Sequence, residues 1–98
     1  MTTFMFAYRM PSDYTPGGAE TVAAWNAWFQ GMGADVADRG NPIFRSATVG
    51  QIGAGTVLGG YSMIVADDLD AALALAEQCP ALSVGGGIEV GVITPLDR

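Results

Sequence analysis

The segment YSMIVADDLDAALALA, residues 61–76, places a strand and a helix in direct succession. Residues 61–66 are apolar and rich in side chains that favour strands, which predicts a strand. Asp67 or Asp68 can then accept hydrogen bonds from the free backbone amides at the start of a helix. The apolar positions of that helix recur at helical spacing: Leu69, Ala72, Leu73 and Ala76. Cys79 precedes Pro80, which disfavours further helix.

The same patterns extend outward along the chain. Strands are predicted over residues 2–8 (TTFMFAY), 44–49 (FRSATV) and 88–93 (IEVGVI). Between the first two of these, apolar residues at helical spacing predict a helix over about residues 19–38, ended by Arg39 and Gly40. Gly31 and Gly33 weaken the later turns of this helix. The glycine-rich residues 50–60 are interpreted as a connection between strands.

The predicted order, β-α-β-β-α-β, is the ferredoxin-like arrangement of an α+β domain. Its right-handed crossovers place both helices on one face of a four-stranded antiparallel sheet. The strands offer apolar side chains on both faces, so the second face needs a cover. We expect a second copy of the chain to pack there, sheet to sheet, as a homodimer. Burying several hundred Å² of apolar surface at about 25 cal/mol per Å² would stabilise it by roughly 10 kcal/mol gross.

Composition excludes several kinds of partner. The 98 residues form one domain, residues 1–98, with a net charge of −6, four arginines, no lysine and no histidine. Nucleic-acid binding requires clustered cations that displace counterions, and four scattered arginines do not supply them. An anionic membrane surface is disfavoured for the same reason. We therefore expect no nucleic acid and no membrane as a partner.

Cys79 is the only cysteine, so no disulfide can form within the chain, and a reducing compartment fits best. No stretch reaches the roughly 18–20 apolar residues of a membrane helix, and the N-terminus lacks a basic signal-peptide region. A cytoplasmic location is expected. With one cysteine and no histidine, no metal site is expected. The glycine clusters at residues 53–55 and 85–87 lack the remainder of a nucleotide motif, so no cofactor is expected.

Four segments together carry a resemblance to a known family: Gly59-Gly60-Tyr61, then residues 66–72 (ADDLDAA), 78–82 (QCPAL) and 86–90 (GGIEV). In these segments the chain resembles the YCII-related (DGPF-like) family, over residues 59–94. The N-terminal half is similar through Phe6-Ala7, the helix with Trp25 and Trp28, and Gly40-Asn41-Pro42.

The resemblance implies the fold of the dimeric α+β barrel superfamily, and hence a dimer, in agreement with the residue patterns. Some YCII-like proteins carry a histidine early in the first helix and an aspartate at the end of the first strand, suggested as an acid–base pair. The matching positions here are Ala24 and Arg9, and the chain has no histidine. No catalytic residue is therefore transferred.

Three residues are candidates for binding a substrate. Arg9 follows the first predicted strand, and its guanidinium can bind a carboxylate, although a surface pairing with Asp13 or Glu20 is the alternative. Asn26 lies beside apolar helix positions, where it can orient a polar group of a substrate, cap a neighbouring backbone group or face solvent. Asp38 can act as a base if it is buried. Otherwise Asp38 is a turn residue.

Two functions fit these residues. The first is binding or transformation of a small organic molecule in a pocket between sheet and helix, an inference from the fold. The alternative is a non-catalytic dimeric module with a regulatory or protein-interaction function. A closed, partly apolar pocket with convergent polar groups favours the first, and shallow clefts filled by Trp25 or Trp28 favour the second.

Overall fold

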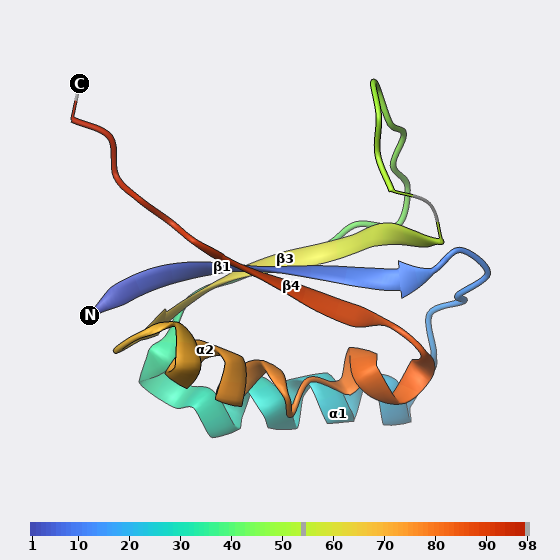
Figure 1. Cartoon of the computed structure of the whole chain (residues 1–98). Coiled ribbons are helices and arrows are strands. Elements are labelled where there is room, and N and C mark those ends of the chain that lie inside the picture. Colours follow the sequence, from blue (N-terminus) through green and yellow to red (C-terminus); the bar gives the residue numbers. More distant parts are fainter. Residues whose placement is uncertain (54, 98) are drawn as a thin grey trace.

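A computed structural model describes residues 1–53 and 55–97 of the chain. It contains four strands, two α-helices and two short 3-10 helices (Figure 1). Their bounds are β1 Thr2–Pro11, α1 Ala19–Met32, η1 Gly33–Asp35, β2 Val36–Pro42, β3 Thr56–Ala66, α2 Leu69–Ala76, η2 Pro80–Val84 and β4 Gly87–Val92.

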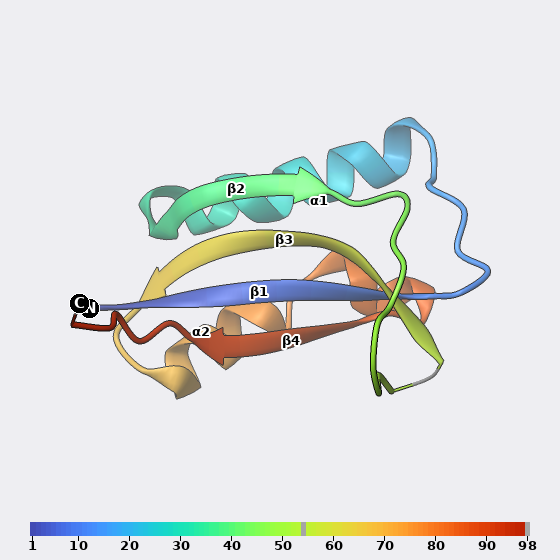
Figure 2. The same cartoon turned by 90° about the horizontal axis from the view of Figure 1, so that it is seen from above.

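The strands form one antiparallel sheet in the order β2-β3-β1-β4. Both helices lie on the same side of this sheet, α1 nearer β2 and α2 nearer β4 (Figures 1 and 2). The prediction of a ferredoxin-like α+β fold with both helices on one face is therefore confirmed.

The strict alternation of β1 separates the two faces of the sheet. Phe4, Phe6, Tyr8 and Met10 are buried beneath the helices, together with Ile64 of β3. The core is completed by the helices, mainly through Trp28, Phe29 and Met32 of α1 and Ala72 and Ala76 of α2. Small residues on α2 let this helix approach the sheet closely, whereas α1 fills its space with aromatic rings.

The predicted second strand was wrong. Residues 44–49 form no strand, and β2 is instead Val36–Pro42, within and just after the segment predicted as the end of the first helix. Helix α1 ends earlier because Gly33 adopts a positive φ of 57°, a conformation that suits glycine and stops the helix. The chain then runs back along β3 as an edge strand, where its polar residues face solvent.

Gly40 allows β2 to lie close against β3. Its φ is 72°, and a Cβ at this position would come within 1.8 Å of the Tyr61 carbonyl oxygen. No other residue type fits both the conformation and the space. The irregular register of β2 against β3, with shifts on both sides of Asp38, accommodates this tight approach.

Helix α2 begins as predicted. Asp68 is its N-cap, and the Asp68 side chain accepts a hydrogen bond from the Ala71 amide at 2.8 Å. The predicted apolar face was only partly right, because Leu69 and Leu73 remain 44% and 42% exposed. The helix is short and contacts the sheet through its alanines, so the two leucines lie at its margin.

The side of the sheet away from the helices has no cover within the described chain. We call it the open face; it carries Thr3, Met5 and Ala7 of β1 and Met63 and Val65 of β3, none of which is buried.

The segment before β3, residues 43–53, rises on this same side and is called the arm (Figure 1). Its apolar side chains Phe44, Val49 and Ile52 are 77%, 95% and 56% exposed. No helix of the described chain is long and apolar enough to cross a membrane.

Candidate functional site

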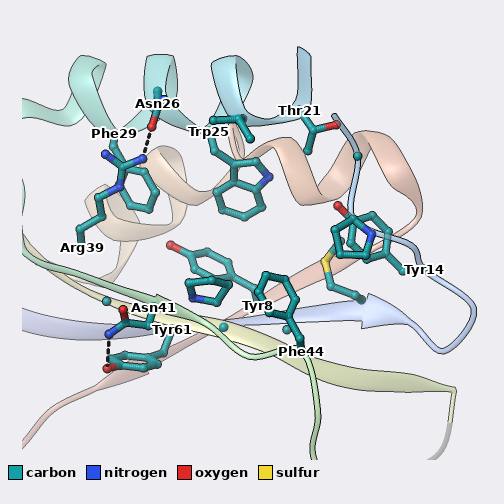
Figure 3. A pocket seen from close by; sticks show the side chains of 18 residues that line it. Tyr8, Tyr14, Thr21, Trp25, Asn26, Phe29, Arg39, Asn41, Phe44 and Tyr61 are labelled. Atoms are coloured by element: carbon teal, nitrogen blue, oxygen red, sulfur yellow. Dashed lines mark hydrogen bonds between the residues drawn. The ribbon is translucent and has the colours of Figure 1, made fainter. Parts of the chain in front are cut away.

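A pocket of about 290 Å³ lies between α1 and the helix-facing side of the sheet (Figure 3). Residues of β1, α1, β2 and β3 line it, together with the loop before α1 and Phe44 at the base of the arm. The two-layer fold creates this space because α1 spans the β2 side of the sheet, where Gly59 and Gly60 contribute no side chains.

Six aromatic residues contribute to the wall. Tyr8 and Trp25 meet edge to face at 4.8 Å between ring centroids, with Tyr8 on the sheet side and Trp25 extending from α1. Phe29 closes one end, 6.2 Å from Trp25, and Tyr14 lies at the other end (Figure 3). Phe44 stands at the exposed edge. The pocket is therefore suited to a flat, apolar body.

Two polar side chains meet at the Phe29 end. Arg39 of β2 donates a hydrogen bond to Asn26 Oδ1 of α1, so the pair bridges helix and sheet (Figure 3). The guanidinium carbon lies 4.6 Å from the centroid of the Phe29 ring, a cation–π contact. Asn41 and Tyr61 also contribute to the lining, but their side chains point away from α1 and bond to each other, at 3.2 Å between Nδ2 and the phenol oxygen.

Tyr8 is fixed as a neutral phenol. Its hydroxyl donates to Ser62 Oγ at 2.7 Å, and Ser62 Oγ donates to the Arg39 carbonyl at 2.5 Å. Burial raises the pKa of Tyr8 well above its usual value, and the bond to Ser62 only partly opposes this effect. At neutral pH, Tyr8 therefore keeps its proton and shapes the pocket without supplying charge.

The three residues proposed from the sequence lie in different places. Asn26 lines the pocket. Arg9 alternates onto the open face, where its Nε and Nη2 donate to Thr56 Oγ1 and the Thr56 carbonyl at 3.2 and 3.1 Å. Asp38 is exposed, and its Oδ1 accepts from the Gly40 amide at 2.8 Å, as a turn residue would. The structure does not bring these three residues together.

Arg39 was not predicted from the sequence as a residue of the site. It was interpreted as a helix stop because the helix was predicted to reach residue 38, which hid its position on a strand that faces α1. Tyr14 was missed because it lies in a loop, where periodicity carries no information, and Phe44 was missed because it was assigned to a strand that does not form. The segment Arg39-Gly40-Asn41 does contain one usable signal, a glycine between polar residues, which is typical of a close backbone approach.

Among residues 1–53 and 55–97, no three histidine, cysteine, aspartate or glutamate side chains lie together as metal ligands would. Tyr14, Thr21 and Trp25 also line a smaller hollow of about 160 Å³, together with Ala24. Ala24 and Arg9, the positions that match the suggested acid–base pair, are on opposite sides of the sheet.

The family model of the YCII-related domain matches residues 1–96, nearly the whole chain. The chain belongs to the YCII-related family. The resemblance over residues 59–94 is thus confirmed, and the match includes the N-terminal half that supplies the pocket. No curated protein and no solved structure matches the chain.

Proposed function

We propose that this YCII-related protein binds a small organic molecule in the pocket between α1 and the sheet. The observation that carries the proposal is the pocket itself, with aromatic walls and the polar pair Asn26 and Arg39 at one end. Ligand sites are concave and mostly apolar, with a few polar groups that orient the ligand. The volume, about 290 Å³, is roughly twice that of an engineered cavity that accepts benzene.

The lining supports binding without acid–base catalysis. None of the eighteen lining residues, all within the described chain, is an aspartate, glutamate or cysteine, and the sequence has no histidine. Tyr8 holds its proton to high pH, and a catalytic base works best with a pKa near the operating pH.

A thermal-shift screen of small organic molecules tests the proposal, because a ligand that binds the folded state raises Tm by mass action. Val22 lines the pocket and is 57% exposed, so Val22→Trp would fill its mouth without disturbing the core. Ala23→Trp is the matched control, since Ala23 is exposed and lies outside the lining. We expect stabilising compounds to lose their effect in Val22→Trp and to keep it in Ala23→Trp. Compounds that act equally on both variants, or none that act on the unmodified chain, would contradict the proposal.

The protein is further proposed to act as a homodimer through the open face. Met5, Met63 and Val65 offer apolar surface there, and a two-fold pairing of the same face on two copies would cover it. Met63→Arg should convert a sedimenting dimer into a monomer, since it would bury two charges across the interface. Leu73→Arg, on the helix side, should leave the dimer intact. Sedimentation of the unmodified chain as a folded monomer would refute this.

A second function, that of a non-catalytic dimeric regulatory or protein-interaction module, is favoured by the arm. Its exposed Phe44, Val49 and Ile52 are the kind of surface that protein partners cover. In this function no small molecule would act through the pocket. The comparison of Val22→Trp with Ala23→Trp therefore separates the two functions.

A further inference from the structure

The geometry points to a specific ligand class for the pocket: a planar aromatic molecule of one or two rings with a single anionic group, bound by Arg39. This inference rests on the proposed binding function and specifies it. The carrying observation is the combination of one guanidinium with a lining that contains no acidic side chain, in a chain whose net charge is −6.

Arg39 has no carboxylate partner within the lining. The adjacent Asp38 is engaged by the Gly40 amide, at 2.8 Å. Asn26 accepts one N–H of the guanidinium, and Phe29 covers one of its faces, so the group is held in place by neutral neighbours. A guanidinium has five N–H donors, and the remaining ones can bind a carboxylate through two parallel hydrogen bonds. The end of the pocket is thus prepared for one anion.

The remaining wall selects the body of the ligand. From the Arg39 end, the pocket runs past the contacting rings of Tyr8 and Trp25 towards Tyr14. Ligand rings that pack against the edges or faces of these aromatic side chains gain affinity beyond the area that they bury. Because the Tyr8 hydroxyl donates its hydrogen bond to Ser62 Oγ, its oxygen can only accept a further hydrogen bond, so Tyr8 contributes no donor to a second anionic group. One negative charge at the Arg39 end is therefore the best match.

Three bicyclic probes with the same carbon skeleton test the inference by calorimetric titration of the full chain. The first is 2-naphthoate, the second is the neutral 2-naphthalenemethanol, and the third is decahydro-2-naphthoate, which keeps the charge without the aromatic rings. We expect 2-naphthoate to bind at least about tenfold more tightly than the alcohol, from charge-assisted hydrogen bonds. We expect it to bind roughly three- to tenfold more tightly than the saturated acid, from the aromatic contacts.

Arg39→Met tests the anion site, and Arg45→Met is the matched control. Both remove one positive charge from an exposed arginine, but Arg45 lies in the arm, outside the lining. Arg39→Met should weaken 2-naphthoate by about tenfold or more and leave 2-naphthalenemethanol unchanged, while Arg45→Met changes neither. Equal losses in the two variants would assign the preference to overall charge and overturn the inference.

The outcomes separate the inference from the proposed function. If the neutral alcohol binds as tightly as 2-naphthoate, and Val22→Trp abolishes both, the pocket binds ligands but the anion preference is wrong. If none of the three probes binds, and the screen finds no compound sensitive to Val22→Trp, the ligand class and the binding function fail together.

Discussion

The hydroxyl of Tyr8 donates a hydrogen bond to Ser62 Oγ at 2.7 Å, and both residues are buried. The two are not direct partners in the sheet, because Tyr8 pairs with Gly60 and Ser62 pairs with Phe6. Ser62 Oγ in turn donates to the Arg39 carbonyl on β2. This pair of hydrogen bonds joins β1, β3 and β2 beneath the pocket, and it anchors the backbone of the arginine proposed to bind the ligand.

Ser62→Ala should destabilise the protein more than Tyr8→Phe. The alanine leaves both the Tyr8 hydroxyl and the Arg39 carbonyl without their partner, at a cost of about 1–3 kcal/mol in the free energy of unfolding. Tyr8→Phe removes one donor, and Ser62 still bonds to Arg39, so a loss of about 1 kcal/mol is expected. Urea denaturation measures both. Ser83→Ala, which removes an exposed hydroxyl, is the control and should change stability little.

Cys79 should make stability fall in alkaline solution. Burial raises the pKa of its thiol from 9.0 to about 11, with partial opposition from a hydrogen bond to the Ala81 backbone. The unfolded thiol loses its proton at lower pH than the folded one. The stabilisation is therefore complete below about pH 9 and is lost as pH rises towards 11. The free energy of unfolding, measured by denaturation between pH 8 and pH 11, should decline less steeply with pH in Cys79→Ala than in the unmodified chain. Parallel declines would contradict the burial of this thiol.

Gly40→Ala should be strongly destabilising. The positive φ of 72° alone costs a residue with a Cβ about 1–3 kcal/mol. The contact with the Tyr61 carbonyl adds to that cost, since backbone must shift to relieve it. Gly31→Ala is the matched control: it lies in α1 with open space around it, and should raise stability by roughly 0.5–1 kcal/mol. Thermal unfolding of the two variants should therefore move Tm in opposite directions.

Asp68→Ala should lower stability by about 1 kcal/mol, because the N-cap hydrogen bond to the Ala71 amide is lost. Asp67→Ala removes the same charge one position earlier, where the side chain is exposed, and should have a much smaller effect. Equal losses in the two variants would mean that the dipole of α2, and not the cap, accounts for the effect.

The elements that could be predicted from the sequence are those in which pattern and packing agree. β1, β3 and α2 have a clear period or a strong cap, and the structure contains all three. β2 could not be predicted, because its residues, VADRGNP, have no strand pattern of their own. They are held extended by pairing with β3, a long-range interaction that composition does not encode. The more strand-like residues 44–49 belong instead to the exposed arm.

The candidate site was predicted only in part for the same reason. Asn26 was proposed because it lies beside Trp25 and Phe29 on the predicted helix, and the structure places it in the pocket lining. The place of Arg39 depends on where β2 lies, so the misplaced strand left Arg39, the one cation among the described lining residues, unpredicted. Tyr14 and Phe44 reach the pocket through loops, and only three-dimensional packing shows this.

The irregular register of β2 also bears on how the protein avoids uncontrolled association. β2 and β4 are the two edges of the sheet, where unpaired backbone groups could recruit strands from other molecules. Along β2, the register shifts, the exposed Asp38 and Arg39, and Pro42 all interrupt such pairing. β4 is short and carries an exposed Glu89. Both edges are therefore poor templates for fibril growth, and open-ended β-stacking of the chain is disfavoured.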